Sequence, residues 1–437
     1  MNKKKFFFHY DSMDTISKYF SIFDENCFFI GDKDEKTRKI PKNIKKIVVN
    51  SSDNIGDSLS SLPENIESLI LACDYTFSSD NNLSHLKHLV VQKYSRSLGN
   101  LPSNLEKLTI IEVSDSFDNL PSRIKELELY GNIETLKNLP PQLESLTIRG
   151  QIMEEVNELP NTLQKISLLG SFNQIISIPS SCKEVIFGEN FDKDINVSDC
   201  EYLEIRNKSY NKYLSVPSNL KSLKLWHVPS RGEIENLPDT LEKLIFMRGG
   251  EECEELIFPE SITHLQLPPA YNHEINHLPK LEWLSIGYQF SQDIILPETL
   301  KELLFSAYQK MENSDEMISE GIYPKLLNIP RNLRVLQIPI ENNFEDGELK
   351  PDLSLFENFE EDGEINVPHL PNLTEVKFLD EFSVMKPKLS IFDDSDETDS
   401  SIDEESLNDE IKQIFQHNPQ VKYTEYECQY DFLTDHV

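Results

Sequence analysis

The sequence predicts a repeat solenoid, α/β or mainly β in class, in which short strands stack into a parallel concave β-sheet. Short irregular segments are expected on the convex side, with a helical cap at each end. The prediction rests on a recurring phrase, Leu-Pro-x-x-Leu-x-x-Leu-x-Leu, whose copies begin at Leu101, Leu120 and Leu139, nineteen residues apart. A fixed period of this size, with apolar residues at alternate positions near its end, is typical of stacked units that each contain a strand.

The first apolar residue after each proline position marks one unit, so the repeat can be followed along the chain. These residues are Ile44, Ile66, Leu86, Leu105, Ile124, Leu143, Leu163, Cys182, Cys200, Leu220, Leu241, Ile262, Leu281, Leu300, Leu333 and Leu373. They are eighteen to twenty-two residues apart as far as Leu300, after which the gaps widen to thirty-three and forty. We therefore expect repeats over residues 40–380, with insertions at about 306–328 and 341–366. The stretches between the strands are too short and too polar for regular helices in most units.

The Leu-Pro phrase resembles the leucine-rich repeat, in the variety whose units open with Ile or Leu followed by Pro. Two stretches, Gly170–Phe191 and Ile286–Pro297, are also similar to the FNIP repeat, the first of them through Phe172-Asn-Gln. That repeat is characteristic of amoebae and of the large viruses that infect them. The resemblance implies a leucine-rich-repeat solenoid over about residues 40–380, and it adds little about the role of the chain.

Residues 1–39 precede the repeats and are predicted to cap the solenoid, because an uncapped end would expose the core. Ile16, Phe20 and Phe23 follow helical spacing within this segment. Some FNIP-type proteins carry an F-box here, a helical module that docks into a ubiquitin ligase, and this is the alternative interpretation.

The other end of the chain is predicted to contain two further segments. Residues 381–405 are rich in Asp, Glu and Ser, which predicts an acidic disordered insertion. Residues 406–437 begin with a side-chain capping pattern and continue with a helical and then a strand-like pattern, so we expect a C-terminal capping helix and strand.

Composition excludes several functional classes. A formal net charge of −34 argues against nucleic acid as a partner, because its phosphates would be repelled. No apolar stretch approaches the roughly eighteen residues that a membrane span needs. The six cysteines have no metal-binding or redox spacing, and Cys182 and Cys200 fill apolar slots of their units as small core residues. We expect a cofactor-free monomer of the cytoplasm, or alternatively the nucleus, that binds no nucleic acid or membrane.

One motif is typical of a zinc enzyme. His273–His277 matches His-Glu-x-x-His, in which two histidines one helical turn apart hold the metal and the Glu acts as a general base. Ile275, however, occupies the same slot of its unit that Phe117 and Leu136 occupy in theirs, and the nearby Pro268 and Pro269 leave little room for a helix. The repeat explains the motif without a metal, so no catalytic or metal site is predicted.

The concave face is the predicted binding surface, since alternate side chains of each strand point away from the core. The side chains expected to form a partner-binding ridge there are Tyr130, Arg149, Tyr202, Arg206, Trp226, Met247 and Trp283. Exposed aromatic, Arg and Met side chains are typical of protein interfaces. The alternative is that Arg206 stacks on Trp226 within the chain and the ridge shields itself.

The sequence therefore predicts a non-enzymatic scaffold that binds a protein partner, whose identity the sequence does not give, on the concave face. The alternative is a substrate-recognition subunit of a ubiquitin ligase, or a pathogen or viral effector that acts on host proteins.

Overall fold

The structure is a computed structural model of the chain. It describes residues 27–31, 43–50, 62–71, 77, 83–94, 101–113, 117, 120–156, 158–228, 237–248, 255–287, 289–305, 324–338, 340–343, 348–351, 353–361, 364–365, 367–379 and 412–426. Most of the expected N-terminal cap and all of the expected acidic insertion lie outside these residues. The described residues form two compact units, the first made of 27–207 and 212–217 and the second of 208–211 and 218–426.

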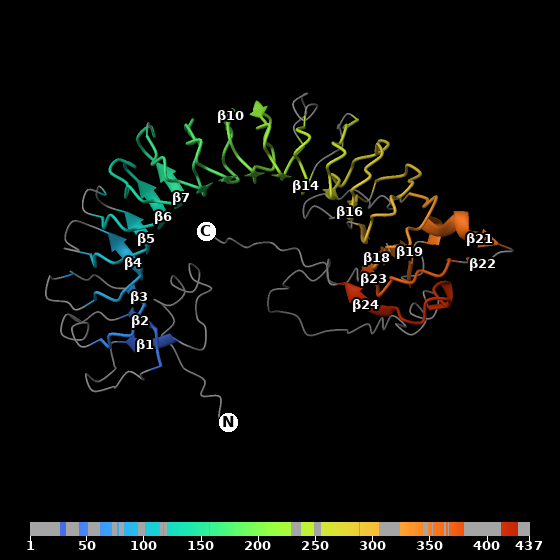
Figure 1. Ribbon diagram of the computed structural model, residues 1–437, viewed down its shortest axis with the longest axis horizontal. Coiled ribbons are helices and arrows are strands. Elements are labelled where there is room, and N and C mark those ends of the chain that lie inside the picture. The colour runs from blue at the N-terminus through green and yellow to red at the C-terminus, as the bar shows by residue number, and fades with distance from the viewer. Residues whose placement is uncertain are drawn as a thin grey trace, which may run out of the picture. The chain divides into compact units, whose positions relative to one another are not determined.

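The first unit is a parallel β-ladder with one strand in each repeat (Figure 1). Its strands, in spatial order, are β1 (Cys27–Gly31), β2 (Lys46–Asn50), β3 (Ser68–Leu71), β4 (His88–Tyr94), β5 (Lys107–Val113), β6 (Glu126–Ile133), β7 (Ser145–Ile152), β8 (Lys165–Leu169), β9 (Glu184–Phe187) and β11 (Tyr202–Ile205). A second, shorter parallel pair joins β10 (Ile195–Asn196) to β12 (Leu214–Ser215).

The second unit continues the same design. Its parallel ladder consists of β13 (Ser222–Leu225), β14 (Lys243–Phe246), β15 (His264–Gln266), β16 (Trp283–Ile286), β17 (Glu302–Phe305), β18 (Val335–Ile338), β23 (Glu375–Leu379) and β24 (Lys422–Tyr426). Between β18 and β23 lie two antiparallel pairs and a 3-10 helix: β19 (Ile340–Asn343) with β20 (Glu348–Pro351), η2 (Leu353–Phe359), and β21 (Glu360–Glu361) with β22 (Glu364–Ile365).

The predicted fold class is confirmed, and helix is rare. Within the described residues, helical backbone is confined to the 3-10 segment η2 and to residues 412–414, so the segments between the strands are irregular as expected. Within the segment predicted as the C-terminal cap, residues 412–414 form one short turn of helix, and β24 is the last described strand of the ladder.

The core forms because equivalent residues of successive units are paired without a shift. Leu127 of β6 pairs with Leu146 of β7, which pairs in turn with Ile166 of β8, and all three side chains are buried. The same holds for the second apolar position of each strand, such as Leu129 and Ile148. Two columns of apolar side chains therefore run along the inside of the sheet, aliphatic in most strands and Phe in the second column of β9, β14 and β17, which is why the apolar spacing has to recur from unit to unit.

In several units, a short polar side chain just before the first apolar residue links the unit to the one before it. Thr162 donates its hydroxyl to the Leu143 carbonyl at 2.7 Å, and Thr240 donates to the Leu220 carbonyl at 2.8 Å. Thr299 makes the same bond to the Leu281 carbonyl at 2.8 Å. The three carbonyl groups lie in the turns before the strands, outside the hydrogen-bonded ladder. The hydroxyl groups give them a donor that the ladder does not supply.

The Phe-Asn element also has a structural role between units. Phe172 and Phe191 lie in the same slot of adjacent units, are both buried, and stack with their ring centroids 6.1 Å apart. The next residue, Asn173, accepts a 2.9 Å hydrogen bond from the backbone N–H of Asp192 in the following unit. The second unit repeats the arrangement, because Asn272, which follows buried Tyr271, accepts from the N–H of Ser291 at 2.9 Å.

A prediction follows from the close contact between β6 and β7 at Gly150. A Cβ at this position would lie only 1.9 Å from the carbonyl oxygen of Gly131, its partner on the adjacent strand. Gly150→Ala should therefore lower the free energy of unfolding by more than about 2 kcal/mol, because the two backbones would have to separate. Chemical denaturation followed by circular dichroism measures this. The control is Gln151→Ala, because Gln151 is the next residue and is exposed. This substitution should change the free energy of unfolding by less than about 0.5 kcal/mol. Equal effects of the two variants would contradict the prediction.

Candidate functional site

The candidate site is the face of each sheet that points away from the aliphatic core. In β6, Leu127 and Leu129 point inward, so Glu126, Glu128 and Tyr130 lie on the opposite face. Because neighbouring strands are in register, equivalent residues form three columns across this face, with about 4.8 Å between neighbours. All seven residues of the predicted ridge belong to the first or the third column.

In the first unit, Tyr130 and Arg149 are held by a carboxylate on the same face. The Tyr130 hydroxyl donates to Glu128 Oε1 at 2.9 Å, and Arg149 Nε donates to the same oxygen at 3.2 Å. The Arg149 guanidinium also lies 5.7 Å from the centre of the Tyr130 ring. As a result Tyr130 is only 8% exposed and offers less surface than a free column position would.

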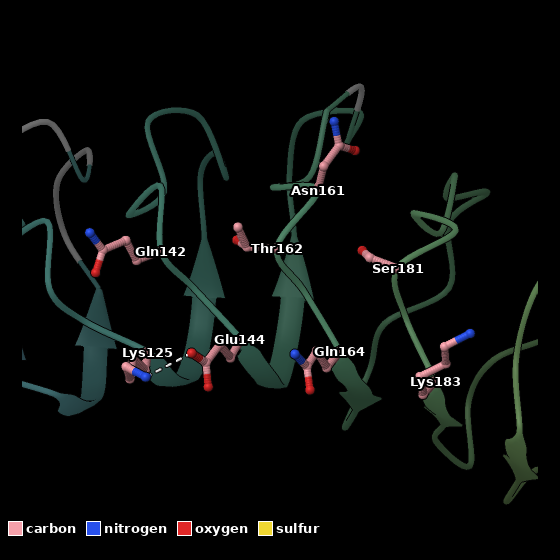
Figure 2. A pocket seen from close by; sticks show the side chains of 8 residues that line it. All are labelled: Lys125, Gln142, Glu144, Asn161, Thr162, Gln164, Ser181 and Lys183. Atoms are coloured by element: carbon pink, nitrogen blue, oxygen red, sulfur yellow. Dashed lines mark hydrogen bonds and ion pairs between the residues drawn. The ribbon is translucent and has the colours of Figure 1, made fainter.

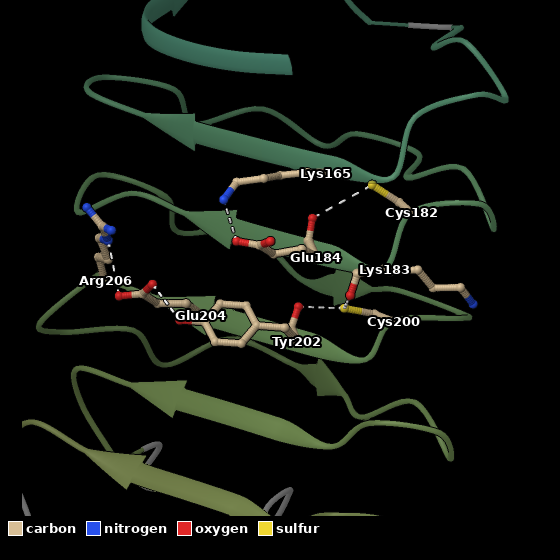
Figure 3. Close-up of polar contacts among 8 residues, drawn as sticks. All are labelled: Lys165, Cys182, Lys183, Glu184, Cys200, Tyr202, Glu204 and Arg206. Atoms are coloured by element: carbon tan, nitrogen blue, oxygen red, sulfur yellow. Dashed lines mark hydrogen bonds and ion pairs between the residues drawn. The ribbon is translucent and has the colours of Figure 1, made fainter. Parts of the chain in front are cut away.

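Tyr202 and Arg206 are arranged in the same way around Glu204 (Figure 3). The Tyr202 hydroxyl donates to Glu204 Oε2 at 3.0 Å, and Arg206 Nε donates to Oε1 at 3.2 Å. The Glu204 side chain is only 4% exposed, so these two donors offset part of the cost of burying a carboxylate. Burial, reinforced by the neighbouring carboxylate, raises the pKa of Tyr202 and keeps the phenol protonated as a donor.

In the second unit the predicted residues are half-buried. Trp226 and Met247 lie in the third column of adjacent strands, β13 and β14. Trp283 lies in the first column of β16, where its ring stacks on the imidazole of His264 with a centroid distance of 6.3 Å. The Trp226 ring is covered not by a column residue but by Lys208, whose Nζ lies 5.7 Å from its centre. Arg206, the cation considered from the sequence, pairs with Glu204.

The His-Glu-x-x-His segment does not form a metalloprotease helix. Residues 273–277 have no helical backbone. Asn276 within them exchanges two hydrogen bonds with Phe258 of the preceding unit, its Oδ1 accepting from the Phe258 N–H and its Nδ2 donating to the Phe258 carbonyl, each at 2.9 Å. The segment is therefore one more connection between units. Across the described part of the chain, no group of three His, Cys, Asp or Glu side chains is placed to hold a metal ion.

Cys182 and Cys200 are core residues. Cys182 and Cys200 are buried in the first apolar slot of neighbouring units, as the sequence predicts. Burial raises the pKa of Cys182 to about 12 and that of Cys200 to about 11, so neither thiol is activated as a nucleophile.

A hollow of about 610 Å³, which sequence reasoning did not single out, lies where the strands of the first unit begin (Figure 2). It is lined by Lys125, Gln142, Glu144, Asn161, Thr162, Gln164, Ser181 and Lys183. Its polar groups serve the stacking of units: Lys125 pairs with Glu144 at 2.8 Å, and Ser181 donates to the Leu163 carbonyl at 2.7 Å. The hollow is thus formed by connections between repeats.

Comparison with known proteins supports the repeat type. Residues 155–190 match the FNIP Repeat family. The chain is also similar to the solved structure of YopM from Yersinia enterocolitica WA-314, with 19% identity and a TM-score of 0.39 over 71% of this chain and 77% of that one. No curated protein matches the chain in sequence. Among the described residues, no helix is long and apolar enough to cross a membrane.

The burial of Glu204 allows a prediction with a control in the same sheet. Glu204→Gln should lower the free energy of unfolding by about 2–3 kcal/mol, because Arg206 would lose the buried charge that it faces. Glu128→Gln removes a carboxylate with the same two types of partner, but the Glu128 side chain is 25% exposed, so the loss should be below about 1 kcal/mol. Chemical denaturation of both variants checks this, and equal losses would contradict it.

A second prediction concerns pH. Burial, and then the charge of Lys243, lower the pKa of His264, with Lys301 acting in the same direction and Glu282 and Glu302 opposing it. The folded state thus favours neutral imidazole, while the unfolded chain takes up a proton near pH 6.5. The contribution of His264 to stability is present above that pH and is lost as the pH falls below it. Denaturation at pH 7.5 and pH 5 should show a smaller loss for His264→Gln than for the unaltered chain; identical losses would contradict the assignment.

Proposed function

We propose that the chain is a non-enzymatic scaffold that binds a protein partner on the open face of its sheet. The observation that carries the proposal is that Trp226, Met247 and Trp283 lie half-exposed on this face instead of in the core. Trp and Met are enriched at protein interfaces, and Trp is among the residues whose truncation most often weakens binding. A rigid ladder presents them without an ordering cost at the moment of binding.

The geometry of the second unit indicates the size of the contact. Trp226 is in the third column of β13, and Trp283 is in the first column of β16, three strands away. Strand spacing and the rise along a strand place the two rings about 20 Å apart. A partner segment of about six extended residues, or about thirteen helical ones, would span both tryptophans. The surface suits a segment that crosses the strands obliquely.

The four predicted residues of the first unit have a different role in this proposal. Tyr130, Arg149, Tyr202 and Arg206 are held by Glu128 and Glu204, so they form fixed polar positions rather than apolar anchors. Fixed donors favour orientation and specificity over raw affinity, because their geometry is set before the partner arrives.

Site-specific crosslinking tests the proposal. A photoreactive residue placed at Met247 should crosslink a discrete partner in cells, whereas the same residue at Ile295, which is 75% exposed and lies outside the strands, should not. Trp226→Ala and Trp283→Ala should each weaken binding of that partner by about tenfold or more.

The control variants for this test are Ile257→Ala and Ile295→Ala, which remove exposed apolar side chains from segments outside the strands. They should leave binding of the partner unchanged. Circular dichroism confirms that each variant is folded. Unchanged binding after both tryptophan substitutions, or the same partner captured from positions 247 and 295, would show that the open face is not the binding site.

A further inference from the structure

Four neighbouring strands of the second unit present a face without acidic residues. The outward positions of β13, β14, β15 and β16 are Ser222, Lys224, Trp226, Lys243, Ile245, Met247, His264, Gln266, Pro268, Trp283, Ser285 and Gly287. Lysine is the only residue with a full charge among them, and Lys208 adds a further ammonium group over the Trp226 ring. This part of the face is therefore basic and aromatic, in a chain whose formal net charge is −34.

The open face of the first unit is organised differently. There, basic residues have a carboxylate partner on the same face: Lys107 pairs with Glu126 at 2.9 Å, Lys165 with Glu184 at 2.6 Å, Arg149 with Glu128 at 3.2 Å and Arg206 with Glu204 at 3.2 Å. None of the outward residues of β13 to β16 is acidic, so the pairing of lysine with glutamate within the face is not repeated there. A local excess of positive charge beside two tryptophans has the composition of a recognition surface for an acidic ligand.

The net negative charge of the chain does not prevent such recognition. At physiological ionic strength, charges more than about 8 Å apart in solvent are largely screened, so remote carboxylates weaken the patch little. Glu282 and Glu302 border the patch and act on His264, so the positive excess is centred on Lys208, Lys224 and Lys243. The exposed ammonium groups of Lys208 and Lys243 act at contact distance. The same screening argument favours a short acidic segment over a long polyanion, because a long chain would extend beyond the patch to acidic surface.

The Trp226 indole carries a polar group whose hydrogen-bonding capacity is unused. Its Nε1 atom is buried and has no hydrogen-bond acceptor in the structure. Leaving a buried donor without an acceptor costs about 1–3 kcal/mol, so such groups require an explanation. A carboxylate or carbonyl oxygen of a bound segment would remove the cost once the half-buried Trp226 side chain turned enough to expose this N–H.

We propose that the face formed by β13 to β16, together with Lys208, binds an acidic peptide segment that carries an apolar anchor. The acidic side chains pair with Lys208 and Lys243, and the apolar anchor packs against Ile245, Met247 and the exposed edge of Trp226. This assignment rests on the proposed scaffold function and adds to it the chemistry of the partner.

Fluorescence anisotropy with the full-length protein tests the assignment. The probe is a short labelled peptide in which Glu alternates with Leu, and the comparison probes are the same peptide with Lys for Glu, the same peptide with Ser for Leu, and an oligothymidylate of equal length. The Glu-Leu peptide should bind best, and its affinity should fall as NaCl is raised. The double variant Lys208→Glu with Lys243→Glu should weaken binding by about tenfold or more.

The matched control is the double variant Lys107→Glu with Lys165→Glu. It reverses two lysine charges on the open face of the first unit, so the net charge changes by the same amount. It should weaken binding of the Glu-Leu peptide by less than about twofold. Equal losses in the two double variants, no binding of the peptide at low salt, or equally tight binding of oligothymidylate would each overturn the assignment.

The crosslinked partner separates failure of this assignment from failure of the scaffold function. If the tryptophan variants lose that partner while the Lys208/Lys243 variant keeps it, the scaffold function stands and the acidic chemistry is wrong. If all of these variants keep the partner, both proposals fail.

Discussion

The stacking of backbone edges is the interaction on which this protein depends. A single strand of four or five residues has hydrogen-bonding groups on both edges, and only a neighbouring unit in the same register satisfies them. The residue just before each strand shows this well, because its N–H donates to the carbonyl of the equivalent residue in the preceding unit. The three successive bonds are Lys125 N–H to the Glu106 carbonyl, Glu144 N–H to the Lys125 carbonyl and Gln164 N–H to the Glu144 carbonyl, each at 2.8 Å. Register is thereby fixed for every side chain that follows.

Because the register is fixed, equivalent residues of successive units lie about 4.8 Å apart. If every unit carried the same charged residue at one position, these charges would repel one another. The residues just before the strands avoid this by alternating in sign, as in Lys45, Glu67, Lys87, Glu106, Lys125 and Glu144. Pairs such as Lys45 with Glu67 are exposed and individually contribute little. Their effect is to avoid the cost of a column of like charges, and this constrains sequence at positions that carry no core packing.

The sequence was sufficient to predict the strands because the alternating apolar spacing recurs from unit to unit, with a preceding proline in most units, and backbone register follows from this repetition. It was not sufficient to predict how side chains arrange on the open face. The burial of Tyr130 depends on Glu128 and on Arg149 of the next strand, whose side chains fold over its ring. The position of a residue along its strand gives the face on which it lies but not such contacts. Lys208 lies in a segment between strands, so column positions gave no reason to place it over Trp226.

The contrast between the two open faces affects what binding would cost. In the first unit a partner that competes for Arg206 must break its bond with a carboxylate that is almost fully buried, and it would leave Glu204 without that charge. Leaving a buried charge unpaired is expensive, so that face resists rearrangement. On β13 to β16 the outward positions contain no carboxylate, and the exposed Lys208 and Lys243 give up mainly hydration when an acidic group arrives. The free-energy balance therefore favours the face of the second unit over that of the first for the partner binding that we propose.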